Sequence, residues 1–339
     1  MKKTLEKLFL GQNLSSDETR LIFAEIIEGK LDSMQLSALL TAMKFKGETA
    51  AEIAGAAASL RDKATHFDRP TGLYADSCGT GGDQGGTINV STISALLAAE
   101  CGVPMVKHGN RSVTSKCGSA DVLSKMGFNN ELSPAKAREL LDETNFTFLY
   151  APSYHQGIRH AMPVRLSLGI RTVFNILGPL ANPAAPPIQS LGVYDATLCL
   201  PMAETLKLLG TEKAMVVHGS GLDEIALHGT TKVCRLDNGV IENITLTASD
   251  FGLKERPLDA FKGGDPSLNA IILTNILKGK GKDAHNDLIA ANTAPLLVMM
   301  GLSADLKSAT DFALNTLASG KAFQRLDKIL TLSNLEKAA

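Results

Sequence analysis

A glycine-rich stretch in the first third of the chain has the composition of a phosphate-binding loop. Residues 76–92 read DSCGTGGDQGGTINVST, between an expected strand at 73–77 and an expected helix that begins near Ser91. Glycines let backbone N–H groups approach an anion, and a helix N-terminus adds partial positive charge. The spacing matches neither GxxxxGK(S/T) nor GxGxxG, which disfavours an NTPase P-loop or a dinucleotide site. Phosphate binding is therefore expected, and the alternative is a loop whose glycines only form tight turns.

A basic loop follows the next expected strand. Residues 106–121 read VKHGNRSVTSKCGSAD and place Lys107, Arg111 and Lys116 among hydroxyl side chains and glycines. Ligands of open α/β sheets gather at the carboxyl ends of the strands, where this loop would lie. Taken alone, the loop is typical of a solvated surface. Beside the glycine-rich stretch, it predicts an anion-binding cradle.

An acidic pair ends a third expected strand. Asp223 and Glu224 close the run VVHGSGLDE at 216–224. An isolated pair of this kind is usually a surface feature, but Mg²⁺ is commonly held by one or two carboxylates together with substrate phosphates. Next to two expected phosphate loops, the pair predicts a magnesium site.

A group of arginines surrounds a short expected helix in the stretch 155–183. Arg159, Arg165 and Arg171 are its members. A guanidinium group can bind a planar carboxylate through two parallel hydrogen bonds. Surface or interface charge is the alternative for each of the three.

The elements that must position these loops form three regions along the chain. Residues 1–70 have the periodicity of helices alone. From Leu73 onward, short apolar runs alternate with helical stretches, which predicts an α/β region with a largely parallel sheet. Asn238-Gly239 predicts a hairpin, and the C-terminal region returns to helix. Capping-box spacing marks three helix starts, at Ser15 with Glu18, Asp32 with Gln35, and Thr49 with Glu52.

Composition limits the classes to which the chain can belong. A length of 339 residues predicts about two domains, and the net charge of −1 gives no global attraction to nucleic acid or to an anionic membrane. No apolar run reaches the roughly 18 residues that a membrane span requires. Five cysteines without CxxC spacing predict reduced thiols in a cytoplasmic protein and disfavour a zinc site.

In this order and spacing, the blocks of the chain together resemble the family of anthranilate phosphoribosyltransferases, and the resemblance covers nearly the whole chain. It implies a small all-α domain at 1–70, completed by a segment around 160–185. It also implies a larger α/β domain at 71–339 with a mainly parallel central sheet, of the nucleoside phosphorylase-like type, with hinge segments near 70–75 and 176–187. A homodimer formed through the helical domain is expected. The blocks are GTGGD (79–83), TxNVST (87–92), KHGNR (107–111), PVR (163–165), RTVFNILGPLxNP (171–183) and GLDE (221–224).

The resemblance further implies an activity in tryptophan biosynthesis. The phosphoribosyl group of 5-phosphoribosyl 1-pyrophosphate (PRPP) would pass to the amine of anthranilate, with release of pyrophosphate. Mg²⁺, with two ions per monomer, would be held by Ser91, Asp223 and Glu224, and Lys107 would act electrostatically without a catalytic acid or base. The implied anthranilate contacts are Gly79, His108, Asn110 and Arg165. The implied PRPP contacts are Gly79, Gly82, Asp83, Thr87, Asn89, Val90, Ser91, Thr92, Lys107, Ser115 and Ser119.

One segment departs from the family pattern, and two other functions remain open. Many members have His-Pro-Ala-Met where this chain has His155-Gln156-Gly157-Ile158, a segment that borders the anthranilate entrance in the family. A pyrimidine nucleoside phosphorylase of the same fold is the first alternative, but phosphorolysis needs no pyrophosphate-bound metal and so leaves the acidic pair unexplained. A non-catalytic relative that binds nucleic acid is the second, which the intact KHGNR block and the net charge of −1 disfavour.

Overall fold

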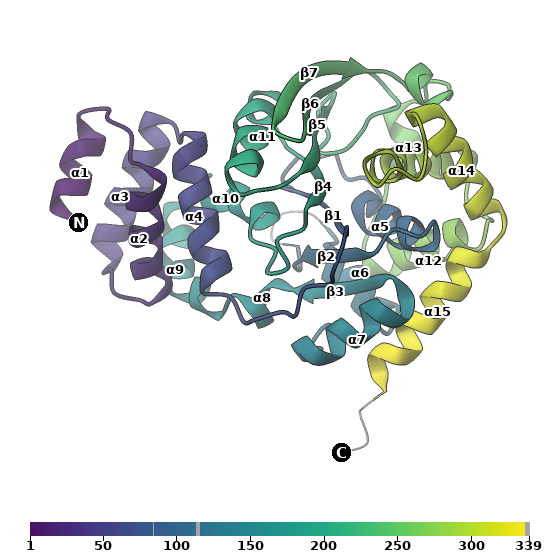
Figure 1. Cartoon of the computed structure of the whole chain (residues 1–339), viewed down its shortest axis with the longest axis horizontal. Coiled ribbons are helices and arrows are strands. Elements are labelled where there is room, and N and C mark those ends of the chain that lie inside the picture. Colours follow the sequence, from purple (N-terminus) through teal and green to yellow (C-terminus); the bar gives the residue numbers. More distant parts are fainter. Residues whose placement is uncertain (84, 113–115, 336–339) are drawn as a thin grey trace.

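The structure is a computed structural model that describes residues 1–83, 85–112 and 116–335. A small helical domain lies at the N-terminal end, beside a larger α/β domain whose central sheet is flanked by helices (Figure 1). The predicted fold class is thus confirmed. Within the described part of the chain, no helix is long and apolar enough to cross a membrane.

The N-terminal helices begin where their capping residues predict. Ser15 and Glu18 exchange hydrogen bonds in a reciprocal capping box, as do Thr49 and Glu52, whereas Asp32 accepts from the next turn without a return bond. The last of these helices ends at Asp62. Residues 63–70 are therefore not helical, and the expectation of helices over the whole of 1–70 was wrong for this stretch. The helices are α1 (Lys2–Phe9), α2 (Ser16–Ile27), α3 (Ser33–Lys46) and α4 (Ala50–Asp62).

The described residues form one mixed sheet, with strands in the order β3-β2-β1-β4-β5-β6-β7. Strands β1 to β5 run parallel, and β6 and β7 are added antiparallel at one edge, so the largely parallel sheet is confirmed. The β6–β7 turn falls at Asn238 and Gly239, whose φ angles of 47° and 86° are those of the predicted two-residue hairpin. The strands are β1 (Ala75–Gly79), β2 (Met105–Gly109), β3 (Phe146–Tyr150), β4 (Ile188–Gly192), β5 (Lys213–Gly219), β6 (Thr231–Asp237) and β7 (Val240–Leu246).

Helices cover both faces of the sheet and divide the apolar side chains of its strands between two cores. In β5, Met215 and Val217 point toward the core that contains α5 and α13, whereas Ala214 and Val216 point toward the core that contains α11. The C-terminal region is helical, as predicted. The helices of this domain are α5 (Val90–Glu100), α6 (Ser119–Lys125), α7 (Pro134–Thr144), α11 (Cys199–Leu208), α12 (Pro266–Leu277), α13 (Asp283–Met299), α14 (Leu306–Ala318) and α15 (Lys321–Asn334).

A segment between β3 and β4 joins the helical domain to the sheet. Helix α9 contacts α3, the 3₁₀ turn η1 contacts α2, and α4 packs on α11. Apolar side chains of this segment and of the N-terminal helices therefore form one continuous core with the α11 face of the sheet. The segment contains α8 (Ala151–Tyr154), η1 (Gln156–His160), α9 (Met162–Leu168), α10 (Phe174–Leu177) and η2 (Gly178–Leu180).

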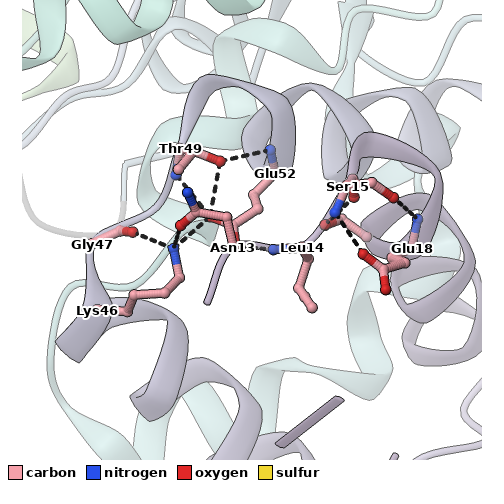
Figure 2. A network of polar contacts seen from close by, with 9 residues as sticks. Asn13, Leu14, Ser15, Glu18, Lys46, Gly47, Thr49 and Glu52 are labelled. Atoms are coloured by element: carbon pink, nitrogen blue, oxygen red, sulfur yellow. Dashed lines mark hydrogen bonds and ion pairs between the residues drawn. The ribbon is translucent and has the colours of Figure 1, made fainter. Parts of the chain in front are cut away.

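A buried ion pair organises the helical domain. Glu52 is fully buried, and its carboxylate lies 2.8 Å from the ammonium group of Lys46, which is 6% exposed. The same carboxylate accepts hydrogen bonds from the backbone N–H of Leu14, at 2.9 Å, and of Thr49, at 2.8 Å. Figure 2 shows these groups gathered around the start of α4. Glu52 thus links the connection before α2, the end of α3 and the first turn of α4.

Glu52→Gln should destabilise the protein by about 3 kcal/mol, because it leaves the Lys46 ammonium group buried without its counter-charge. Urea unfolding followed by circular dichroism measures the change. Glu6→Gln is the control, since Glu6 is exposed, lies 3.9 Å from the exposed Lys2, and should change stability by less than about 0.5 kcal/mol. Equal effects of the two substitutions would contradict the organising role of Glu52.

Candidate active site

The loops that carry the expected site residues meet at one edge of the sheet. Because β1, β2 and β5 are parallel, the chain leaves all three at the same edge, after Gly79, Gly109 and Gly219. The strand order reverses between β1 and β4: the chain moves outward from β1 to β3 and then returns to the other side of β1. Open α/β sheets bind ligands at such a switch point, so the glycine-rich loop after β1 begins where this fold places ligands.

Glycines at two strand ends let the acidic loop approach the glycine-rich loop. A Cβ at Gly79 would lie 2.3 Å from Oδ2 of Asp223, and a Cβ at Gly192 would lie 1.5 Å from the Asp223 carbonyl oxygen. The Asp223 carboxylate occupies the space beside Gly79, and the Asp223 backbone carbonyl occupies the space beside Gly192. The carboxylate also accepts a 2.6 Å hydrogen bond from the N–H of Gly81. Asp223 thereby joins the loops that follow β1, β4 and β5.

Three carboxylates are brought together here. Oδ2 of Asp83 lies 3.4 Å from the backbone N–H of Asp223, and the Thr87 hydroxyl donates to Glu224 at 3.3 Å. Burial, followed by the neighbouring charge of Asp83, raises the pKa of Asp223 to about 7. Burial and the charges of Asp223 and Asp83 also raise the pKa of Glu224 well above its ordinary value. Such a group of mutually repelling acids is stabilised by a cation.

The donors at this position fit a hard divalent cation. Mg²⁺ prefers oxygen ligands and commonly takes one or two carboxylates together with phosphate oxygens. The third expected ligand, the hydroxyl of Ser91, lies in the first turn of α5 and accepts a 3.2 Å hydrogen bond from Nζ of Lys107. Within the described ranges, no three or more His, Cys, Asp or Glu side chains form a preformed metal site. The acidic pair and the Ser91 hydroxyl offer oxygen donors of the kind that Mg²⁺ prefers.

Lys107 directs a buried positive charge to the start of the glycine-rich loop. Its side chain is only 1% exposed, and Nζ donates to the Ser77 carbonyl oxygen at 2.5 Å. Burial lowers the pKa of Lys107, and the nearby carboxylate of Asp76 opposes this shift. Because the ammonium group also reaches Ser91, it lies between the end of β1 and the N-terminus of α5. That position suits a negatively charged group on the loop.

Side chains replace part of the backbone pairing between β1 and β2, and sequence reasoning missed them. The two strands pair at Ala75 and Met105. Farther along, the buried carboxylate of Asp76 accepts from the N–H of His108 at 3.3 Å and from the amide of Asn182 at 2.9 Å. The Asn182 amide also donates to the Val106 carbonyl oxygen at 2.8 Å. Asp76 and Asn182 therefore hold the strand that carries Lys107 and His108.

His108 lies in a buried pair of imidazoles. Its Nδ1 is 3.2 Å from the Gly178 carbonyl oxygen, which can only accept, so Nδ1 carries the proton and Nε2 is an acceptor. The His155 ring lies edge-on, with the two ring centroids 5.2 Å apart. Burial lowers the pKa of His108 well below its ordinary value and that of His155 to about 4. Both rings are therefore neutral at pH 7.

Several expected PRPP-binding residues connect the loops to one another. The Asn89 amide donates to the Cys117 carbonyl oxygen at 3.0 Å, and the Thr92 hydroxyl donates to the Ser119 hydroxyl at 3.0 Å. These bonds join the start of α5 to the start of α6. Ser115 lies outside the described residues. Val90 is the first residue of α5, one position before the expected start near Ser91.

The segment before β4 supplies a partly buried guanidinium group. Arg165 lies on α9, with its guanidinium carbon 5.0 Å from the Phe174 ring centroid, and burial lowers its pKa. None of the ion pairs among the described residues includes it. Arg165 thus has the chemistry to bind a carboxylate from outside the chain.

Asn110 is exposed just beyond β2, and its side-chain oxygen accepts from the N–H of Arg111 at 2.7 Å.

Comparison with protein families defines the class of the protein. The helical bundle domain of the glycosyl transferase family matches residues 2–64, and the a/b domain of that family matches residues 71–323. An anthranilate phosphoribosyltransferase of Aeromonas salmonicida is 53% identical over 99% of this chain and 100% of its own length. Another from Pseudoalteromonas translucida is 51% identical over 98% of this chain and 94% of its own length. The chain belongs to the anthranilate phosphoribosyltransferase family.

Solved structures agree with this assignment. The anthranilate phosphoribosyltransferase of Thermus thermophilus is similar with a TM-score of 0.93 and 37% identity, covering 98% of this chain and 99% of that one. The Saccharomyces cerevisiae enzyme in complex with PRPP and Mg is similar with a TM-score of 0.88 and 30% identity, covering 98% of this chain and 97% of that one. The same architecture therefore holds PRPP and Mg in a relative.

Proposed function

We propose that this chain transfers the phosphoribosyl group of PRPP to the amine of anthranilate, as the names of its relatives indicate for those proteins. The observation that carries the proposal is the convergence of a glycine-rich loop, a buried lysine and an acidic pair at the switch point of the sheet. The backbone N–H groups of the glycine-rich loop and the ammonium group of the lysine can bind an anion, and the two carboxylates can bind a divalent metal ion. A pyrophosphate carrying a metal ion fits all three features.

The leaving group determines which catalytic groups the reaction needs. The bond between the amine nitrogen and C1 of the ribose forms as the bond from C1 to the pyrophosphate oxygen breaks, and the amine then loses a proton to water. The amine of anthranilate is neutral at pH 7, so attack requires no general base. We assign Lys107 and the N–H groups of the glycine-rich loop to the negative charge that develops on pyrophosphate. Bound Mg²⁺ would supply further charge stabilisation to the same oxygens.

We assign the remaining expected residues by their place around this charge. Asp223, Glu224 and Ser91 would hold Mg²⁺, and we expect two ions per protein chain. The rest of the glycine-rich loop and the loop from Lys107 to Ser119 would hold PRPP. Arg165 would bind the anthranilate carboxylate, with Asn110 and Gly79 nearby. The neutral His108 would offer Nε2 as an acceptor, which suits an amine that carries protons.

We propose that two copies of this chain associate through the helical domain. The side chains of Phe9, Met34 and Phe45 on α1 and α3 are 70%, 82% and 94% exposed. Phe9 and Phe45 also line a shallow recess together with small residues of α3, among them Ala38 and Ala42. Exposed apolar patches of this kind are typical of interfaces between proteins.

Domain movement and location complete the proposal. The helical domain, with the segment around 160–185, would close on the sheet about hinges near 70–75 and 176–187, which would exclude water from the activated sugar. Packing of α9 on α3 supports the inclusion of that segment.

A cytoplasmic location agrees with five free cysteines.

Arg165→Ala should raise the KM for anthranilate by about 10- to 100-fold, because it removes a charge-assisted pair of hydrogen bonds to the carboxylate. The KM for PRPP should change by less than about threefold, since that substrate lies on the other loops. Steady-state kinetics with each substrate varied in turn measures both values. Arg159→Ala, on the neighbouring turn η1, is the control. Equal changes in the two KM values would refute the assignment.

The function itself is tested by the fluorescence of anthranilate, which should decay only when the protein, PRPP and Mg²⁺ are all present. EDTA should stop the decay. The double variant Asp223→Asn with Glu224→Gln should lower the rate by about 100-fold or more, since both carboxylates of the cation site are lost. Asp68→Asn, which changes an 81% exposed carboxylate, should leave the rate unchanged. A flat trace from folded wild-type protein would overturn the function.

Phe45→Asp should convert a dimer into a monomer at micromolar concentration, because it buries a charge in the proposed interface. Size-exclusion chromatography with light scattering gives the mass in each case. Ile271→Asp, which alters a 60% exposed side chain on α12 of the other domain, should leave the mass unchanged. A monomeric wild-type protein would rule out this interface.

A further inference from the structure

Arg171 crosses from the segment before β4 to the glycine-rich loop. It lies between α9 and α10, and its Nη2 donates a 2.7 Å hydrogen bond to the carbonyl oxygen of Gly82. The guanidinium group stacks on Tyr194, with the guanidinium carbon 3.9 Å from the ring centroid. Tyr194 in turn donates its backbone N–H to the hydroxyl of Thr80, at 3.0 Å, in the same loop. Arg171 is therefore held in place by the loop it contacts and by the residues just after β4.

The hydrogen bond to Gly82 determines where the next N–H group points. In a trans peptide, the carbonyl oxygen and the N–H lie in one plane and point in opposite directions from the C–N bond. Because the Gly82 oxygen faces Arg171, the N–H of Asp83 faces away from Arg171. Oriented backbone N–H groups of this kind make anion-binding sites in glycine-rich loops. The arginine thus determines the direction of one N–H group of the expected pyrophosphate loop.

The loop needs such a partner because its own backbone is free to rotate. Gly81 and Gly82 have φ angles of 66° and 77°, in the left-handed region that glycine enters as readily as its mirror image. On one side, the N–H of Gly81 is bound by Asp223 at 2.6 Å. On the other side, the carbonyl of Gly82 is bound by Arg171. The two side chains thus hold the Thr80–Gly81 peptide and the Gly82–Asp83 peptide, one on each side of the Gly81–Gly82 peptide, in a stretch that glycine alone would leave mobile.

We propose that Arg171 is a positioning residue for PRPP: it fixes the Gly82–Asp83 peptide so that the Asp83 N–H is directed to the pyrophosphate. The proposal rests on the function proposed above and assigns a role that differs from that of Arg165. Arg165 would bind anthranilate directly, whereas Arg171 acts through the backbone of the loop. Because both lie on the segment between β3 and β4, that segment would order both substrate sites.

The test compares Arg171→Met and Arg171→Lys with the wild type, and uses Arg159→Met as the control. Isothermal titration with PRPP and Mg²⁺, without anthranilate, should show affinity about tenfold weaker for Arg171→Met and partly restored for Arg171→Lys, which keeps a donor. Arg159→Met should bind like the wild type. Hydrogen exchange of the ligand-free proteins should show faster exchange at residues 79–83 in Arg171→Met, with the exchange of β1 and α5 unchanged.

The outcomes separate this inference from the function on which it rests. Wild-type affinity for PRPP in Arg171→Met, or unchanged exchange at residues 79–83, would overturn the positioning role alone. Failure of the wild-type chain to bind PRPP would overturn the function and the inference together. If Arg171→Met does not fold, Tyr194→Leu is measured in the same way. It removes only the ring beneath the guanidinium group and should weaken PRPP binding about threefold, and wild-type affinity in that variant would likewise overturn the role.

Discussion

Asp223 occupies space that side chains at two strand ends would otherwise fill, with its carboxylate beside Gly79 and its backbone carbonyl beside Gly192. Gly79 ends β1 and Gly192 ends β4, and a Cβ at either position would collide with Asp223. With both positions open, the loop after β5 reaches across β4 to the loop after β1 and binds it through the N–H of Gly81. The remainder of the site depends on this approach, because it brings the acidic pair to the glycine-rich loop and the lysine.

The site concentrates buried charge that the fold must accommodate. Lys107, Asp76, Asp223 and Glu224 are packed closely enough for burial to shift the pKa of each toward its neutral form. Desolvation of a charged group costs several kcal/mol unless partners compensate for it. In the helical domain, the Glu52–Lys46 pair has such partners within the chain. In the candidate active site, the metal-bound pyrophosphate of the proposed function would be such a partner, and its binding would then be coupled to charge balance.

The segment between β3 and β4 connects the two domains both physically and chemically. Its apolar side chains belong to the core shared by the N-terminal helices and one face of the sheet. Its polar groups reach three parts of the site: Arg171 binds the glycine-rich loop, Gly178 binds His108, and Asn182 binds Asp76. Movement of this segment would therefore alter several site contacts at once, so the proposed domain closure would change the geometry of the glycine-rich loop and of β1 and β2.

The amino-acid sequence determined the features that depend on near neighbours along the chain. The capping pairs at Ser15 and Thr49, the hairpin at Asn238-Gly239 and the order of strands and helices follow from local backbone chemistry and hydrophobic period. The position of the loops after β1, β2 and β5 at one edge of the sheet was predictable as well, because parallel strands direct their carboxyl ends to one edge. Only the tertiary structure decided which distant groups meet. The contacts of Asp76 with Asn182 and of Arg171 with Gly82 span 106 and 89 residues, and no sequence spacing encodes a distance that chain folding alone creates.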